Sequence, residues 1–274
     1  MVHVVSFGTT GVSTKYRDYS KDLKRLEREA HSLGCSFEAY DQSSESFVNS
    51  RLAQNRYPMR KGAGYWSWKP DIILDAISKN PDKVILYLDA DFELVRLSEL
   101  LDGFNKENFG IALAPMSHQL KDWITKRCAE HFKFSSTMDS LVYSASAILV
   151  NPENDGCVPS LIHWRDKLSI PKLLLDPVFT FRSNHRHDQT IISAMIAMGM
   201  IKVSDLPDII FIEGVSSEVD YERAWLRSKK TSNNVTGRFH FFLMIRSIIF
   251  HKWELIKFWL TGIIPLNRRK KFYD

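Results

Sequence analysis

Two aspartates, Asp89 and Asp91, follow an apolar run in the sequence VILYLDADFE. The run from Val84 to Leu88 is rich in strand formers and has no helical period, which predicts a strand buried on both faces. Two carboxylates this close at the end of a buried strand need a cation or hydrogen-bond donors to neutralise them. Open α/β sheets bind ligands at the carboxyl ends of their strands, so the pair predicts a divalent metal carrying a nucleotide diphosphate. The alternative is an acidic turn or a helix cap.

A third candidate carboxylate, Asp188, lies in the sequence HRHDQT at the start of an apolar helix that ends at Gly199. In a cleft at that helix terminus, Asp188 could accept a proton from an acceptor hydroxyl. It could equally cap the helix. The neighbouring His185 and His187 could bind metal, phosphate or an acceptor, or belong to a polar loop.

Residues 62–70, GAGYWSWKP, contain three aromatic side chains within four positions, namely Tyr65, Trp66 and Trp68. The glycines allow backbone conformations that other residues resist. The aromatic faces could stack on sugar rings, while Arg60 and Lys69 supply cations for a diphosphate or an acidic sugar. The same aromatic residues could instead form a corner of the core.

The elements expected to position these residues alternate between strands and helices. Val2–Phe7, an amphipathic helix that ends at Gly34 and the strand Ser36–Tyr40 open a nucleotide-binding α/β sheet. The loop after the first strand lacks the Rossmann and P-loop spacings, so it either contacts a nucleotide or is a plain connection. A right-handed β-α-β crossover would bring this loop, the aromatic turn and the aspartate pair together.

The rest of the chain continues this alternation. The patterns predict further strands at 109–114, 138–142, 144–151, 200–204 and 209–213, and helices at 44–53, 70–77, 119–132, 158–168 and 191–198.

Composition favours a globular protein in a reducing compartment. The chain has 274 residues, 44% hydrophobic and 25% charged, enough for one substantial core. Its three cysteines have no CxxC spacing and predict free thiols. Neither a secretory signal nor an apolar run of transmembrane length is visible, so we expect a cytoplasmic protein.

The net charge of +5 is concentrated at the carboxyl end. Before Thr236 the basic and acidic residues nearly balance, which argues against a nucleic-acid partner. Residues 236–274 alternate apolar segments with charges and end in four consecutive basic residues, Arg268 to Lys271. This pattern predicts a basic amphipathic helical tail on an anionic membrane surface, peripheral on the inner face of the cell membrane. The alternative is a terminal helix docked on the domain.

Four pieces in order resemble the metal-dependent GT-A glycosyltransferases, particularly bacterial enzymes that build capsule and lipopolysaccharide O-antigen chains. They are the strand and loop ending at Phe7–Thr10, the GAGYWSWKP block, ILYLDAD, and HRHDQT before a helix. The resemblance covers residues 1 to about 200. It implies an α/β fold of the GT-A type, a Rossmann-like mixed sheet flanked by helices, in a catalytic domain of residues 1–235.

In such enzymes the Asp-x-Asp motif holds Mn²⁺ or Mg²⁺, which bridges the nucleotide diphosphate. Carried over, Asp91 would be the more direct metal ligand and Asp89 would lie by the ribose or the metal. The donor site would comprise Phe7, Gly8, Thr9, Arg60, Lys69, Asp89 and Ala90. The sugar or acceptor site would comprise Tyr65, Trp66, Trp68, His185, His187 and Gln189. A further metal-binding histidine of many relatives has no match, because His240 lies in the tail.

The resemblance further implies transfer of a hexose from a UDP-sugar to a lipid-linked glycan, with galactose expected from the family's common donors. Asp188 matches the acidic residue that deprotonates the acceptor in inverting members. Two other functions stay open: a sugar nucleotidyltransferase, and a non-catalytic glycan-binding protein at the membrane. Glycoside hydrolysis is disfavoured because its two carboxylates lie several ångströms apart across a sugar.

Overall fold

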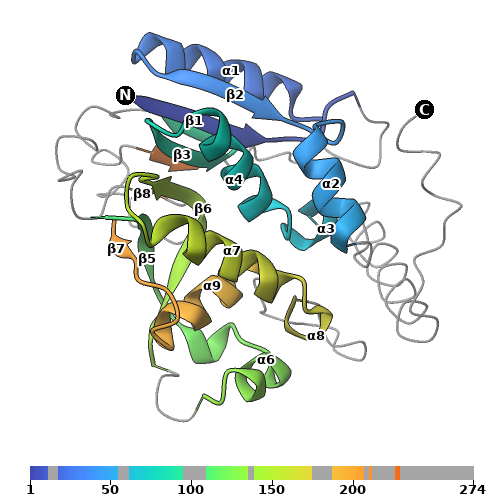
Figure 1. The fold of residues 1–274 in the computed structure, drawn as a ribbon, viewed down its shortest axis with the longest axis vertical. Helices are drawn as coiled ribbons and strands as arrows, with labels where there is room; N and C mark the ends of the chain where they lie inside the picture. The colour runs from blue at the N-terminus through green and yellow to red at the C-terminus, as the bar shows by residue number, and fades with distance from the viewer. Residues whose placement is uncertain are drawn as a thin grey trace, which may run out of the picture.

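A six-stranded mixed sheet forms the central layer of the protein, in the order β2-β1-β3-β6-β5-β7 (Figure 1). The computed structural model describes residues 1–11, 18–54, 62–94, 109–134, 139–174, 187–206, 210–211 and 226–228. The strands are β1 (Val2–Phe7), β2 (Ser36–Tyr40), β3 (Val84–Asp89), β5 (Ile111–Gln119), β6 (Leu141–Val150) and β7 (Ser204–Asp205). Strand β6 runs antiparallel to its neighbours β3 and β5, and the other pairs are parallel. The predicted mixed α/β sheet is confirmed.

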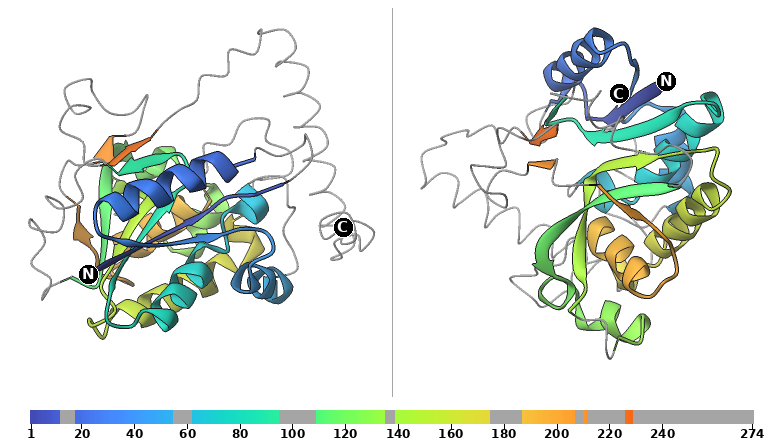
Figure 2. Two further views of the ribbon diagram at one scale, coloured as in Figure 1. Left: turned by 90° about the horizontal axis from the view of Figure 1, so that it is seen from above. Right: turned by 90° about the vertical axis from the view of Figure 1, so that its left-hand side faces the viewer.

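Helices cover both faces of this sheet. They are α1 (Ser20–Ser32), α2 (Glu45–Gln54), α3 (Gly62–Tyr65), α4 (Lys69–Lys79), α6 (Lys126–His131), α7 (Cys157–Leu168), α8 (Pro171–Leu174) and α9 (Asp188–Ala197). Figure 2 (left) shows α1 on one side of the sheet and α4 and α7 on the other. In β3, Ile85 and Tyr87 join the core under α4, α7 and α9, whereas Leu86 and Leu88 join the core under α1. This alternation explains the unbroken apolar run of β3.

The chain changes direction across the sheet between β1 and β3. From β1 it passes through α1 to β2 on one side, and it later returns through α4 to β3 on the other side. Ligands of open α/β sheets bind at such a switch point, beyond the carboxyl ends of the strands. Phe7 lies opposite Asp89 in the parallel register, so the first loop and the aspartate pair leave the sheet side by side.

A second, three-stranded sheet begins directly after β3. It consists of β4 (Phe92–Leu94), β9 (Leu226–Ser228) and β8 (Ile210–Phe211), in that order. Because β4 starts so soon, Ala90 and Asp91 form the short turn between the two sheets. Strand β4 lies against α1.

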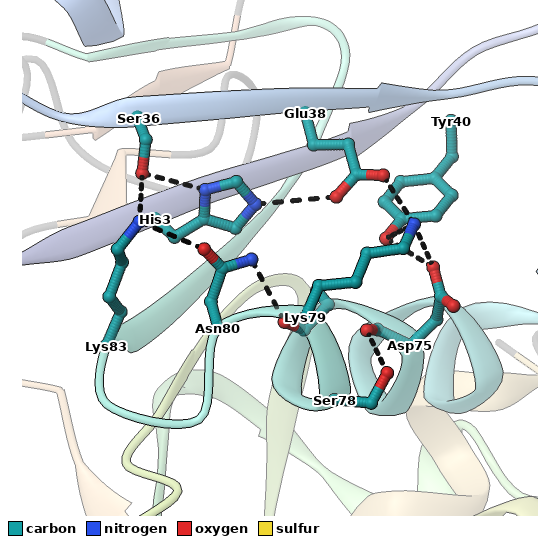
Figure 3. A network of polar contacts seen from close by, with 10 residues as sticks. His3, Ser36, Glu38, Tyr40, Asp75, Ser78, Lys79, Asn80 and Lys83 are labelled. Atoms are coloured by element: carbon teal, nitrogen blue, oxygen red, sulfur yellow. Dashed lines mark hydrogen bonds and ion pairs between the residues drawn. The ribbon is translucent and has the colours of Figure 1, made fainter.

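A polar network ties the edge strand β2 and the amino-terminal part of β1 to α4 (Figure 3). Nδ1 of His3 lies 2.9 Å from Oγ of Ser36, and its Nε2 lies 3.6 Å from a Glu38 carboxylate oxygen. Nζ of Lys79 lies 2.7 Å from carboxylate oxygens of both Glu38 and Asp75. The carboxyl-terminal half of α4 is thereby fixed to the sheet, while Lys69 begins the same helix at its opposite end.

One predicted helix is wrong over much of its length. Residues 119–132 were expected to be helical, but β5 continues to Gln119, which pairs with Leu141, and is followed by the 3-10 turn Leu120–Asp122. The helix α6 starts only after Thr125, whose side chain accepts a hydrogen bond from the Cys128 amide and caps it. Pairing with β6 extends the strand, and the single strand β6 (Leu141–Val150) covers most of the two predicted pieces 138–142 and 144–151.

Several expectations lie outside the described residues. Arg60, His185 and the whole tail of residues 236–274 belong to this group, as does the predicted domain boundary at residue 235. Among the residues that the structure describes, no helix is long and apolar enough to cross a membrane.

Candidate active site

A buried lysine joins two of the three candidate carboxylates, Asp89 and Asp188. Nζ of Lys69, the first residue of α4, lies 3.1 Å from Oδ1 of Asp89 and 3.1 Å from Oδ2 of Asp188. It also donates a hydrogen bond of 2.8 Å to the carbonyl oxygen of Ala145 in β6. Only 2% of Lys69 is exposed. Burial lowers the pKa of Lys69, but the carboxylates of Asp188 and Asp89 outweigh it and hold that pKa above its usual value.

Asp89 is held in place by a second donor. The hydroxyl of Tyr87 donates a hydrogen bond of 2.7 Å to Oδ1, the same oxygen that lies next to Lys69. Burial first, and then the charge of Asp89, raise the pKa of Tyr87 well above its usual value, and the charge of Asp91 contributes in the same direction. Tyr87 therefore stays protonated and, together with Lys69, holds Oδ1 of Asp89 in place.

Asp188 is a buried carboxylate whose proton affinity suits a general base. It is 4% exposed, and burial raises its pKa to about 6, with the charge of Asp89 adding to the effect and Lys69 opposing it. Its Oδ2 lies 3.1 Å from the Lys69 ammonium. Asp188 is the first residue of α9, and His187 stands at the cap position, so Asp188 is not the N-cap.

An unusual backbone turn delivers Lys69 to this position. Four consecutive residues, 63–66, have positive φ angles of 49°, 107°, 60° and 58°, and only Gly64 among them lacks a side chain. Left-handed conformations cost L-residues roughly 1–2 kcal/mol each. The buried hydroxyl of Ser67 stabilises the turn by donating a hydrogen bond of 2.8 Å to the Gly64 carbonyl oxygen. Such strain is concentrated at functional sites, where the surrounding structure enforces it.

The turn also encloses His187, the residue before Asp188. Its ring stacks on Trp66, with centroids 5.9 Å apart, and meets the edge of Tyr65 at 4.7 Å. Nδ1 lies 2.8 Å from the carbonyl oxygen of Leu174, which requires Nδ1 to carry the proton and donate it. The backbone of His187 has φ 48° and ψ −111°. The structure thus gives His187 a buried setting beside Asp188.

Two of the three aromatic residues lie in the core. The ring of Trp68 contacts Phe7 at a centroid distance of 4.0 Å and lies near Tyr87 at 6.4 Å. Tyr65 is fully buried, and Trp66 is half-buried. The corner-of-the-core alternative therefore describes Tyr65 and Trp68 in this structure. Of the three, Trp66 retains accessible surface for a sugar.

The first loop lies beside the aspartate pair. The Gly8 amide donates a hydrogen bond to Tyr40, and a Cβ at Gly8 would come within 2.5 Å of the Tyr19 side chain, so only glycine fits there. Thr9 is buried, and its carbonyl accepts a hydrogen bond from the Tyr19 amide. Ala90 is buried as well.

Gln189, the other predicted acceptor residue, lies on the first turn of α9. Its Nε2 is 2.7 Å from Sδ of Met116 in β5, and the residue is half-buried.

The aspartate pair supplies part of a binding site for a hard divalent cation. Magnesium is commonly held by one or two carboxylates together with substrate phosphates, and Asp89 and Asp91 supply such a pair. Tyr87 and Lys69 orient Asp89 from behind, as outer contacts do for metal ligands. Within the described ranges no group of three or more His, Cys, Asp or Glu side chains converges on one point. The third protein ligand expected by resemblance is not among these residues.

Sequence reasoning missed three contributors to this site. Tyr87 was assigned only to an apolar run, and the carbonyl oxygen of Ala145 carries no side-chain signal. Arg25, on α1, donates a hydrogen bond of 3.2 Å to the carbonyl oxygen of Ala90, between the two aspartates. Its only sequence signal is the i,i+4 spacing with Glu29.

The chain path is similar to solved structures of glycosyltransferases. A glycosyltransferase involved in the glycosylation of the major capsid of PBCV-1 is 14% identical, with a TM-score of 0.46 over 84% of this chain and 93% of the other. Mouse xyloside xylosyltransferase 1 gives the same identity and TM-score over 84% and 97%. The galactosyltransferase LgtC, in complex with donor and acceptor sugar analogs, is 11% identical, with a TM-score of 0.43 over 89% and 95%. No protein-family model and no curated protein sequence matches this chain.

Proposed function

We propose that this protein is a metal-dependent glycosyltransferase that uses a nucleotide-diphosphate sugar. The observation that carries the proposal is the buried Lys69 ammonium, which holds Asp89 at the end of β3 and Asp188 at the start of α9 around one point. The point lies at the switch between β1 and β3, where sheets of this kind bind nucleotides. The resemblance of the four sequence pieces to GT-A enzymes supports the same chemistry.

Asp188 would act as the base. Its carboxylate would accept a proton from an acceptor hydroxyl, the acceptor oxygen would form a bond to the anomeric carbon, and the bond from that carbon to the diphosphate oxygen would break. The pKa of about 6 leaves the carboxylate mostly ionised at neutral pH while keeping it basic enough to accept the proton. A base that deprotonates the acceptor serves a single displacement, in which the acceptor oxygen attacks the anomeric carbon from the face opposite the diphosphate, so Asp188 in this role favours inversion.

Asp89 and Asp91 would hold Mn²⁺ or Mg²⁺. When bound, such an ion supplies positive charge that stabilises the departing diphosphate. Lys69 and Tyr87 contact Oδ1 of Asp89 and orient it from the side facing the core. Phe7, which pairs with Asp89 in the parallel register, and the following Gly8 would border the nucleotide.

The donor and the acceptor are proposed from the resemblance and the sequence together. We propose a UDP-hexose as donor, with galactose as the first sugar to test, and a lipid-linked glycan as acceptor. Support for the lipid-linked acceptor comes from residues 236–274, whose basic amphipathic sequence suits an anionic membrane on the cytoplasmic side.

A turnover assay tests this function. The nucleoside diphosphate released from UDP-galactose, UDP-glucose and GDP-mannose is measured with Mn²⁺ and alkyl glycoside acceptors. We expect release with one donor, and a decrease of about 100-fold or more in Asp188→Asn, because general-base catalysis contributes that much. Asp166→Asn, a largely exposed position in α7, is the control. Glycan binding without release from any donor would favour the glycan-binding alternative.

A further inference from the structure

Two charged residues of α1, Arg25 and Glu29, form hydrogen bonds with the segment that follows Asp89. Nη1 of Arg25 lies 2.9 Å from a carboxylate oxygen of Glu29, one helical turn later. Nη2 of the same guanidinium donates a hydrogen bond of 3.2 Å to the carbonyl oxygen of Ala90. The other oxygen of Glu29 accepts a hydrogen bond of 3.0 Å from the amide of Leu94.

These contacts fix both ends of a five-residue segment. The segment starts at Ala90, between the aspartates, and ends at Leu94 in β4. The carbonyl of Ala90 and the amide of Asp91 belong to one planar peptide unit. A donor that fixes that carbonyl therefore also fixes the direction in which the chain enters Asp91.

Residues on opposite faces of the sheet thus restrain the two aspartates separately. Tyr87 and Lys69 hold Asp89 on the face covered by α4 and α9. Arg25 holds the Ala90–Asp91 peptide from the opposite face, which α1 covers. The side chains of Arg25 and Glu29 are only 18% and 25% exposed, which strengthens their interaction relative to an open surface pair.

We propose that Arg25 and Glu29 are positioning residues that set the place of Asp91 relative to Asp89. The role in cation binding rests on the proposed function, whereas the restraint of the turn does not. Neither residue contacts the proposed metal or substrate in this role. They act through the backbone of residues 90–94.

The restraint is tested by hydrogen exchange measured on residues 90–94 of the full chain. Arg25→Met and Glu29→Gln should each speed exchange in this segment by about tenfold, the change expected when a hydrogen bond to a charged group is lost. Arg25→Lys should restore part of the protection. Arg28→Met and Glu27→Gln, exposed on the same helix, should leave it unchanged.

The role of Arg25 and Glu29 in cation binding is tested by measuring Mn²⁺ affinity with and without UDP. The electron paramagnetic resonance signal of free Mn²⁺ follows the binding. Loss of outer contacts typically weakens metal binding by 10- to 100-fold, so about a tenfold weaker affinity is expected in Arg25→Met and Glu29→Gln. Exchange that stays at the wild-type rate in both variants would overturn the proposal. Faster exchange with unchanged Mn²⁺ affinity would also overturn it. A wild type that binds no Mn²⁺, with faster exchange in the variants, would refute the metal-dependent function while confirming the restraint.

Discussion

Lys69 and Asp188, separated by more than one hundred residues, form a buried ion pair with 3.1 Å between Nζ and Oδ2. Each is the first residue of its helix, Lys69 of α4 and Asp188 of α9. A carboxylate at a helix amino terminus is stabilised by the helix dipole, whereas an ammonium there is not. Lys69 therefore depends on its carboxylate partners, and its contacts connect the strand that bears Asp89 to the helix that bears Asp188.

Replacing Lys69 with an uncharged residue should therefore lower the stability of the protein. In Lys69→Met, Asp89 and Asp188 lose their counter-ion, and the free energy of unfolding should fall by about 3–5 kcal/mol at pH 8. Without Lys69 the pKa of Asp188 rises further above its unfolded value, so the stability of the variant should be highest at low pH and be lost as the pH rises. Denaturant unfolding at pH 5 and pH 8 measures both effects.

Lys79→Met supplies the matched control on the same helix. Its ammonium is 47% exposed and pairs with Glu38 and Asp75 near the surface, so its loss should cost about 1 kcal/mol or less. Equal losses in the two variants, or a Lys69→Met variant that is more stable at pH 8 than at pH 5, would contradict a charge-compensating Lys69.

The pKa of Asp188 predicts how kcat/KM falls at acidic pH. The base must be ionised to accept a proton, so kcat/KM should fall as the pH drops through about 6, by about tenfold per unit below it. A pH–rate profile between pH 5 and 8, with buffers of constant ionic strength, gives the measurement. A flat profile across this range would remove Asp188 from the role of base.

We expect His187 to stabilise the protein through the hydrogen bond that its Nδ1 donates. Asparagine can place an amide donor near the position of Nδ1, whereas the longer glutamine side chain cannot do so without moving. Both variants lose the ring contacts with Trp66 and Tyr65, so their difference reflects the hydrogen bond to the Leu174 carbonyl together with the greater tolerance of asparagine for the positive φ of this position. His187→Asn should be more stable than His187→Gln by about 1–3 kcal/mol, and should retain more activity. Equal unfolding free energies in the two variants would argue against this donor role.

The sheet and the aspartate pair were predictable because each rests on local pattern. The strands Val2–Phe7 and Ser36–Tyr40 were predicted with their observed bounds, and the run before Asp89 is a strand buried on both faces. The apolar stripe predicted for the first helix comprised Leu23, Leu26, Ala30 and Leu33. The first three are buried against the sheet, whereas Leu33, at the end of the helix, is exposed. Local periodicity determines these features, so a single sequence reveals them.

Long-range contacts could not be read in the same way. Lys69 was expected to contact a diphosphate, and no pattern in the sequence around it indicates that Asp188 lies beside it. The restraint by Arg25 depends on a carbonyl 65 positions away, which leaves no side-chain pattern. The extension of β5 to Gln119 arises from pairing with β6, which overrides the helical pattern of the following residues.

The central claim, that Asp89 and Asp91 hold a divalent cation with a nucleotide diphosphate, is tested most directly by calorimetry. UDP and GDP are titrated into wild type and Asp91→Asn, each with Mn²⁺ and with EDTA, and Asp155→Asn, at an exposed position, serves as control. We predict that one nucleotide binds wild type at least about tenfold more tightly with Mn²⁺, and that Asp91→Asn loses this difference. Equal nucleotide affinity with and without the ion in wild type, or a difference that survives in Asp91→Asn, would contradict the claim.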